Sequence, residues 1–193
     1  ASAELVGPSR WRLSGLLRGQ AGTEGAMVDV LPEGARFVLL DEAVARMPGG
    51  AAAQGSHWAL KAGPAGASPD DVAFAQGEVS YAALGRLPFA PAQVSAVRTG
   101  GDVVMSWVRR ARDDAGTWSE LEVALGEEAE LYRLEVLDGE DVKRRVDVSA
   151  AGFVYGAAMQ SADWGGAAPE PLNVRVAQVS PRFGVGAWRT AEI

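Results

Sequence analysis

The pattern of apolar and polar positions changes along the chain near residue 87. Before this point, apolar residues form short runs separated by stretches rich in Gly and Pro, which is typical of short strands joined by turns. The runs predict strands at residues 10–17, 36–40, 57–61 and 78–82. Residues 49–55, which are mostly Gly and Ala, predict a loop.

A period of two becomes clear after residue 88. Val103, Met105 and Trp107 share one face of a predicted strand, and the same alternation runs from Tyr132 to Val136. Such alternation predicts antiparallel sheets with one buried face. Asp138-Gly139 predicts a tight turn between two strands. Short strands at this spacing, with a Trp on an apolar face, predict a β-sandwich.

Leu87-Pro88-Phe89-Ala90-Pro91 separates the two patterns. Two prolines so close together disfavour both a helix and a central strand, so the segment predicts a stiff joint between domains. The predicted fold class is therefore all-β. It comprises a small β-rich domain at residues 1–87 and an antiparallel β-sandwich at residues 88–193.

Composition and charge narrow the functional classes. The 193 residues are 48% hydrophobic and 22% charged, as in an ordinary globular chain, and 24 Gly and 10 Pro favour strands and turns. The net charge is −7. Asp113 and Asp114 follow the basic cluster at residues 109–112, and acidic residues flank the cluster at residues 143–145, so we interpret both clusters as solvated faces. We therefore expect no nucleic-acid binding. The absence of cysteine excludes disulfides, and no apolar run is long enough to predict a membrane span.

Patterns that carry catalytic chemistry are weak. His57 is the single histidine, and no serine lies in a Gly-x-Ser-x-Gly elbow. The acidic residues between Glu120 and Glu130 are typical of solvated loops, so a glycosidase pair or another small hydrolase is the least favoured alternative. We expect a protein that is not an enzyme and that uses neither a cofactor nor a metal.

Six tryptophans offer candidate binding surfaces. Trp107 is predicted to lie in the core, and Trp11 and Trp58 also lie on predicted strands with a buried face. Trp118 and Trp164 lie instead in polar or Gly-rich loops. Each of these two either caps an edge of the sandwich or presents its flat face to a partner or a sugar ring. They are the candidate partner- or glycan-binding residues.

Leu17-Arg18-Gly19-x-x-Gly22-Thr23-Glu24 interrupts the first apolar run. Gly19 and Gly22 permit backbone conformations that other residues avoid. The fork of Arg18 is suited to clamping exposed carbonyls or a carboxylate, and Thr23 is suited to capping the turn. We interpret these four residues as a structural motif, with a ligand-binding loop as the alternative.

Residues 89–193 resemble a fibronectin type III domain. The matching pieces are the leading Ala90-Pro91, the strand ending at Trp107, the strand from Tyr132 and the strand at residues 174–180. Two departures from that family stand out. Leu172 occupies the place where the family has a Tyr, and the connection from residue 109 to residue 127 is unusually long.

The order of motifs along the whole chain resembles the C-terminal region of the tail-tip host-specificity proteins of phages and gene transfer agents, the megatron-like baseplate proteins. The resemblance rests on residues 17–24, residues 34–41 and the Ala90-Pro91 joint before the sandwich. It implies a non-enzymatic structural and attachment module of a virion tail tip or baseplate, part of a DNA delivery particle.

The same resemblance implies partners and a location. It implies a homotrimeric parent protein, contacts with other baseplate proteins, and recognition of polysaccharide on the recipient cell. It places the protein in the virion, assembled in the bacterial cytoplasm and released to the outside. The alternative function is a pair of accessory carbohydrate-binding domains from a secreted polysaccharide-acting enzyme, for which we expect a monomer with saturable glycan binding.

Overall fold

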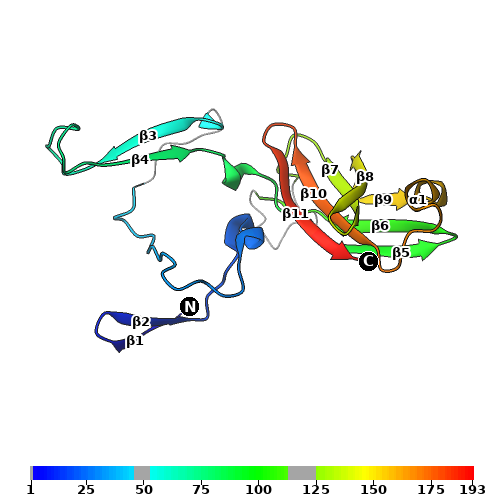
Figure 1. Cartoon of the computed structure of the whole chain (residues 1–193), viewed down its shortest axis with the longest axis horizontal. Helices are drawn as coiled ribbons and strands as arrows, with labels where there is room; N and C mark the ends of the chain where they lie inside the picture. Colours follow the sequence, from blue (N-terminus) through cyan, green and yellow to red (C-terminus); the bar gives the residue numbers. More distant parts are fainter. Residues whose placement is uncertain (1, 46–52, 113–124) are drawn as a thin grey trace. The chain divides into compact units, whose positions relative to one another are not determined.

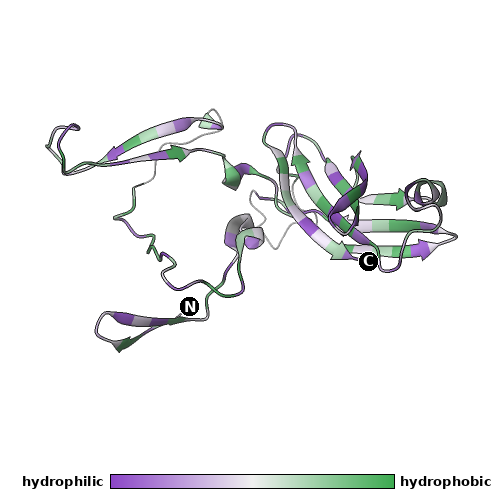
Figure 2. Cartoon of the chain, in the orientation of Figure 1, coloured by the Kyte–Doolittle hydropathy of each residue, from purple (hydrophilic) through white to green (hydrophobic). Residues whose placement is uncertain are grey.

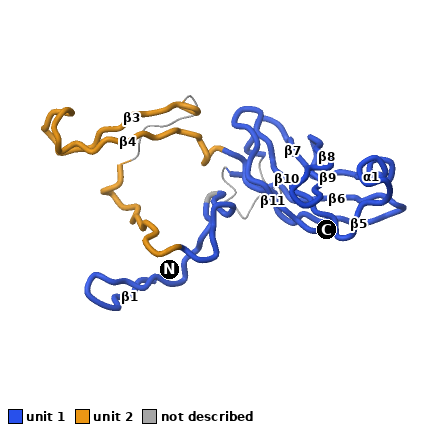
Figure 3. Tube along the Cα trace, in the orientation of Figure 1, with its two compact units in different colours: residues 1–31, 87–193 blue, residues 32–86 orange. Residues whose placement is uncertain are grey.

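The computed structural model describes residues 2–45, 53–112 and 125–193. Contacts between residues divide the chain into two units (Figure 3). Residues 1–31 belong to the same unit as residues 87–193, and residues 32–86 form the other. The predicted domain boundary between residues 87 and 88 lies next to the unit boundary between residues 86 and 87, whereas the boundary between residues 31 and 32 was not predicted. The division into domains at residues 1–87 and 88–193 stays a prediction.

A sandwich of two antiparallel sheets forms the part of the larger unit that follows residue 87 (Figure 1). One sheet has the strand order β5-β6-β9 and the other has the order β11-β10-β7-β8. The predicted all-β fold with a fibronectin type III-like sandwich is thus confirmed. The strands are β5 (Ala92–Thr99), β6 (Asp102–Val108), β7 (Tyr132–Asp138), β8 (Asp141–Val148), β9 (Gly152–Tyr155), β10 (Asn173–Ser180) and β11 (Gly184–Glu192).

The core of the sandwich follows the period of two. Val103, Met105 and Trp107 are each at most 5% exposed, and the Trp107 ring meets the Tyr132 ring edge-on with centroids 5.4 Å apart. Figure 2 shows the alternation of hydrophobic and hydrophilic positions along the sandwich strands. Leu172, which replaces the expected Tyr, is fully buried in the same core. The core predictions for this region are confirmed because each strand has an opposing sheet to pack against.

The tight turn predicted at Asp138-Gly139 joins β7 to β8. Gly139 has a φ of 60° there, a conformation that favours glycine. The turn aligns the two strands so that Asp138 pairs with Asp141.

A short helix, α1 (Ala157–Trp164), crosses between β9 and β10, where the sequence predicted only a Gly-rich loop. The carboxylate of Asp102 accepts a hydrogen bond of 2.8 Å from the Ala157 amide, and Gly165 ends the helix with a φ of 74°. The buried amide of Gln160 donates to the carbonyls of Gly101 and Tyr155. These tertiary contacts stabilise a helix that is too short to form by propensity alone.

The N-terminal region, residues 2–86, holds two separate hairpins. They are β1 (Ser2–Gly7) with β2 (Arg10–Ser14), and β3 (His57–Ala62) with β4 (Ala75–Ser80). The prediction of a strand at residues 36–40 is wrong, because Phe37 to Leu40 pair with no strand and are 64–80% exposed. Short 3₁₀ turns complete the region: η1 (Gln20–Gly22), η2 (Glu24–Ala26) and η4 (Leu84–Arg86).

Almost nothing in the N-terminal region is buried. Among its described residues, only Ala83 falls in the buried class. Trp11 is 61% exposed, so its predicted core position is wrong, and Trp58 is half-buried against Tyr81 with ring centroids 5.9 Å apart. A two-stranded ribbon without an opposing layer has no interior in which to bury such rings.

Candidate functional site

The Arg-Gly-x-x-Gly-Thr motif forms a turn that is held together by its own side chains. Gly19 and Gly22 both have positive φ, at 67° and 79°. The Thr23 hydroxyl donates to the Gln20 carbonyl at 2.8 Å, and the Arg18 guanidinium donates to the Val28 carbonyl at 2.6 Å. The structure thus brings all four motif residues into one local turn, in which the Arg18 and Thr23 side chains bind backbone carbonyls of the same segment.

The turn packs against the start of the sandwich in the same unit. A Cβ atom on Gly22 would lie 2.5 Å from the Phe89 ring, so only glycine lets the ring approach this closely. The Glu24 carboxylate lies 2.5 Å from the Arg110 guanidinium, which also lies over the Phe89 ring at 5.2 Å. The pKa of Glu24 is lowered by a backbone hydrogen bond and by Arg110. The motif therefore fixes the chain to the predicted joint, a contact that sequence spacing alone does not predict.

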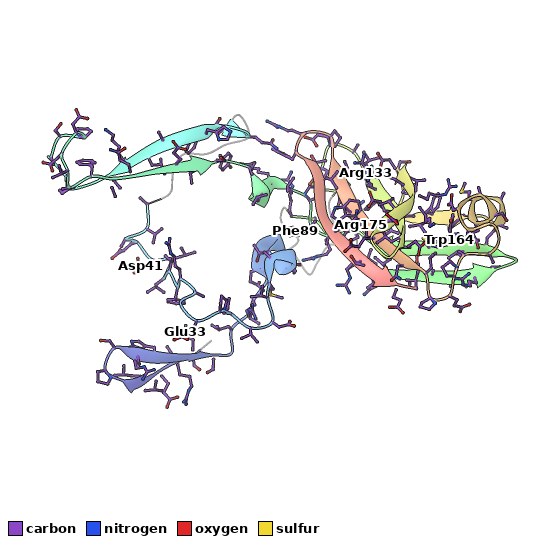
Figure 4. All side chains as sticks on the ribbon, in the orientation of Figure 1. Glu33, Asp41, Phe89, Arg133, Trp164 and Arg175 are labelled. Carbon is purple, nitrogen blue, oxygen red and sulfur yellow. The ribbon has the colours of Figure 1, made fainter. Side chains whose placement is uncertain are left out.

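The two candidate tryptophans have different outcomes. Trp118 lies outside the described residues. Trp164 is half-buried at the end of α1 and packs against the core cluster (Figure 4). Its Nε1–H donates to the Tyr155 hydroxyl at 3.0 Å, and the Lys143 ammonium lies 5.3 Å from the centroid of its ring. This packing favours the first of the two predicted roles, that of capping the sandwich, and binding by Trp164 stays a prediction.

A buried polar network surrounds Trp164. The Tyr155 hydroxyl donates to Asp163 at 2.6 Å, and Arg144 donates to both carboxylate oxygens of Asp163 at 2.6 and 2.8 Å. Burial opposes ionisation of Asp163, but the hydrogen bonds from Arg144 and Tyr155 outweigh it, so the pKa of Asp163 is lowered. Burial also raises the pKa of Tyr155 to about 12. The network ties α1 to β8 and β9, and the reason for its presence is structural.

Charged residues in register cover the outer face of the four-stranded sheet. Glu135 is 1% exposed and lies 2.5 Å from both Arg145 and Arg175, one on each neighbouring strand. Arg133 forms two hydrogen bonds of 2.7 Å with Asp147 in the adjacent row (Figure 4). The sequence analysis interpreted the basic cluster at residues 143–145 as solvated. Arg133 and Glu135 lie two positions apart, so the sequence alone indicates that they share one face of a strand. It does not indicate that Asp147 and Arg145 lie opposite them, because that depends on which strands pair.

His57 begins β3 opposite Ser80 on β4, and its Nδ1 lies 2.8 Å from the Ser80 hydroxyl. A serine beside a histidine is part of the arrangement that activates a nucleophile. Here the pair is exposed on a two-stranded ribbon, and within the described ranges no carboxylate forms a hydrogen bond with His57. The arrangement is that of a cross-strand hydrogen-bonded pair.

No group of three or more His, Cys, Asp or Glu side chains in residues 2–45, 53–112 and 125–193 is arranged to hold a metal ion. Within the same ranges, no helix has the length and apolar character needed to cross a membrane.

Comparison with known proteins adds a partial family match. The family described as Rcc01698-like, C-terminal, matches residues 1–38, which include the Arg-Gly-x-x-Gly-Thr motif. No curated protein matches the chain.

Among solved structures, the chain is similar to the crystal structure of the rat CD45 extracellular region, domains d3-d4. The identity is 10%, the TM-score is 0.36, and the match covers 100% of this chain and 94% of that one. A TM-score of this size is too low to assign a fold. The evidence for the sandwich is therefore the strand order of the two sheets described above.

Proposed function

We propose that this chain is a non-enzymatic structural and attachment module of a virion tail tip or baseplate. The observation that carries the proposal is the unburied apolar surface of the N-terminal region. Of the 24 large hydrophobic side chains that are exposed in the described residues, 18 lie before residue 87. Isolated hairpins are at best marginally stable in water, and exposed apolar surface of this extent is typical of a segment that packs against a partner.

The distribution of this surface suits assembly better than catalysis. The exposed apolar residues are spread over both hairpins and over the extended run Phe37 to Leu40. A segment that orders on contact with neighbours can cover a large area of an assembly. The sandwich, by contrast, has a core of its own and is suited to remain accessible, where it would contact a recipient cell.

The family match supports the same proposal. It covers residues 1–38, and the name of that family is associated with gene-transfer-agent proteins. On this proposal the module belongs to a homotrimeric parent protein in the virion and contacts other baseplate proteins through its N-terminal region.

Incorporation into particles tests the proposal. Phe37→Ser with Leu40→Ser removes apolar surface from the N-terminal region without touching a core. We expect at least a tenfold loss of the protein from purified tailed particles, measured by quantitative mass spectrometry. The matched control is Val97→Ser with Val154→Ser, which removes residues that are 65% and 52% exposed on the sandwich and is expected to leave incorporation unchanged.

Two results would contradict the proposal. One is equal incorporation of the two double variants. The other is a natural protein that is a secreted monomer and never associates with particles, which would instead favour accessory carbohydrate-binding domains of a polysaccharide-acting enzyme.

A further inference from the structure

A groove of about 470 Å³ runs along the edge of the sandwich beside β11. Four consecutive residues of β11, from Ala187 to Thr190, line one side of it. Neighbouring residues of a strand point to opposite faces, so a surface formed by four in a row lies along the strand's edge. β11 is the terminal strand of its sheet, and at this edge the Ala187 amide donates to the Pro88 carbonyl at 3.1 Å. Arg189 and Thr190 follow this contact along the strand and are exposed. The other side is formed by residues 90–93, Arg110 and Glu24, and the volume is within the range of small-ligand sites.

The aromatic residue in the lining of the groove is Trp188, which is not one of the binding candidates predicted from the sequence. Trp188 is half-buried and pairs with Ala177 on β10. The Arg175 guanidinium lies 4.8 Å from the centroid of its ring, and Arg175 is itself held by the buried carboxylate of Glu135. The ring is thus positioned on a rigid strand before any ligand arrives, which lowers the entropic cost of binding.

Arg189 differs from the other arginines of the sandwich. Eight of the ten arginines in residues 87–193 form an ion pair with a carboxylate. Arg182 lies over the Phe183 ring. Arg189 is exposed and has no hydrogen-bond or ion-pair partner among the described residues, although it lines the groove. A guanidinium without an internal partner is available for an external anion.

Neutral polar groups complete the lining. Gln93 and Thr190 are exposed and form no side-chain hydrogen bond within the described part of the chain. Gln93 has a φ of 50°, which is uncommon for a residue other than glycine and costs backbone energy. An amide and a hydroxyl both donate and accept hydrogen bonds, as the hydroxyl groups of a sugar require.

We propose that this groove binds an acidic saccharide. One sugar ring of an acidic oligosaccharide packs on Trp188, a carboxylate of the same chain pairs with Arg189 on the other side of the strand's edge, and hydroxyl groups bind Gln93 and Thr190. The ionised side chains of the lining, Arg110, Arg189 and Glu24, sum to +1, whereas the whole chain carries −7. The choice of a saccharide over an acidic peptide rests on the proposed attachment function and on the neutral hydroxyl-binding groups beside the cation.

Titration of the full chain with tetragalacturonate tests the inference. We expect saturable binding by calorimetry, with nuclear magnetic resonance shifts confined to the amide signals of residues 90, 92, 93 and 187–190. Arg189→Gln is expected to weaken binding about tenfold, as for the loss of a charge-assisted hydrogen bond. Arg182→Gln is the matched control, because it removes the same charge outside the groove, and it is expected to leave the affinity unchanged.

The aromatic contact has its own variants. Trp188→Ala is expected to abolish measurable binding. Because this change also removes packing under Arg175, Trp188→Phe serves as the second variant and is expected to keep the fold, checked by near-ultraviolet circular dichroism, while weakening binding several-fold. Trp164→Phe is the control for a tryptophan outside the groove and is expected to bind as the wild type does.

Three results would overturn the inference: no saturable binding of tetragalacturonate, equal losses in Arg189→Gln and Arg182→Gln, or tighter binding of tetraglutamate than of tetragalacturonate. The proposed function is tested separately. A chain that enters particles but does not bind the saccharide overturns the groove alone. A chain that binds the saccharide but never enters particles overturns the tail-tip assignment and leaves the groove in place.

Discussion

The N-terminal region and the sandwich contain strands of similar length, yet they differ in what those strands cover. In the sandwich, β6 and β7 place alternate residues against an opposing sheet, so side chains such as Met105 and Leu134 are 1% exposed. In the N-terminal region each hairpin is a single layer, and Leu5 and Trp11 of the β1–β2 hairpin are 59% and 61% exposed. Apolar residues at strand-forming positions do not by themselves create a core, because a core requires a second layer.

The difference in buried apolar surface also suggests different roles for the two regions. A region whose apolar surface is already buried is stable alone and can present other groups to its surroundings. A region whose apolar surface remains exposed gains stability only on contact with a partner. Three comparisons within the chain test how far this contrast extends.

The largest expected effect comes from removing equivalent leucines in the two regions. Leu134→Ala deletes a fully buried side chain and is expected to lower the free energy of unfolding of the sandwich by about 2–5 kcal/mol. Leu40→Ala deletes a side chain that is 80% exposed and is expected to change it by less than about 0.5 kcal/mol. Urea unfolding, followed by circular dichroism, measures both. Equal losses would show that the N-terminal region has a core of its own.

A smaller effect is expected at the turn that joins the N-terminal region to the sandwich. Gly22→Ala adds a Cβ atom 2.5 Å from the Phe89 ring at a φ of 79°, so we expect a loss of about 1–3 kcal/mol in the packing of this turn. Faster proteolysis within residues 18–31 measures the loss. Gly25→Ala is the control, because its added Cβ meets no heavy atom within 4 Å. Similar proteolysis of the two variants would contradict the packing described for Gly22.

The smallest effect concerns ion pairs between strands. The hydrogen bonds from Arg133 lower the pKa of Asp147 below its ordinary value of 3.8. The pair therefore stabilises the fold above this value and loses its contribution as the pH falls through the lowered pKa. We expect Asp147→Asn to destabilise the sandwich by up to about 1 kcal/mol at pH 7, and the difference from the wild type to vanish in acid.

Thermal unfolding at several pH values measures this difference. Glu4→Gln is the control, since Glu4 pairs with Arg12 at 3.4 Å in the exposed β1–β2 hairpin and is expected to have no effect on the sandwich at any pH. A difference between Asp147→Asn and the wild type that persists unchanged in acid would contradict the assigned cause.

The sequence predicted the parts of the fold that depend on local spacing. The alternation from Val103 to Trp107 and the turn at Gly139 are both present in the structure. The strand expected at residues 36–40 is absent, because an apolar run forms a strand only where another strand pairs with it. Helix α1 was missed because its stability comes from Asp102 and Gln160 rather than from its own eight residues.

The residues of the candidate site also depend on tertiary contacts that the sequence does not predict. The sequence selected Trp118 and Trp164 because they lie in loops, and the structure finds Trp164 packed against the sandwich core. Trp188 and Arg189, which lie on strand β11, instead line a groove together with Gln93. Residues about a hundred positions apart become neighbours only when the sheets close.

By itself, the sequence determined the all-β class, the core face of the sandwich strands, and the turn-forming character of Gly19 and Gly22. These follow from side-chain alternation and backbone freedom, which are properties of a few consecutive residues. The tertiary structure alone decided which strands have an opposing layer, which two arginines of the described sandwich form no ion pair, and where a groove forms. Those features depend on contacts between segments that are distant in the sequence. The pattern of apolar residues does not show which apolar strand faces will pack against a second sheet.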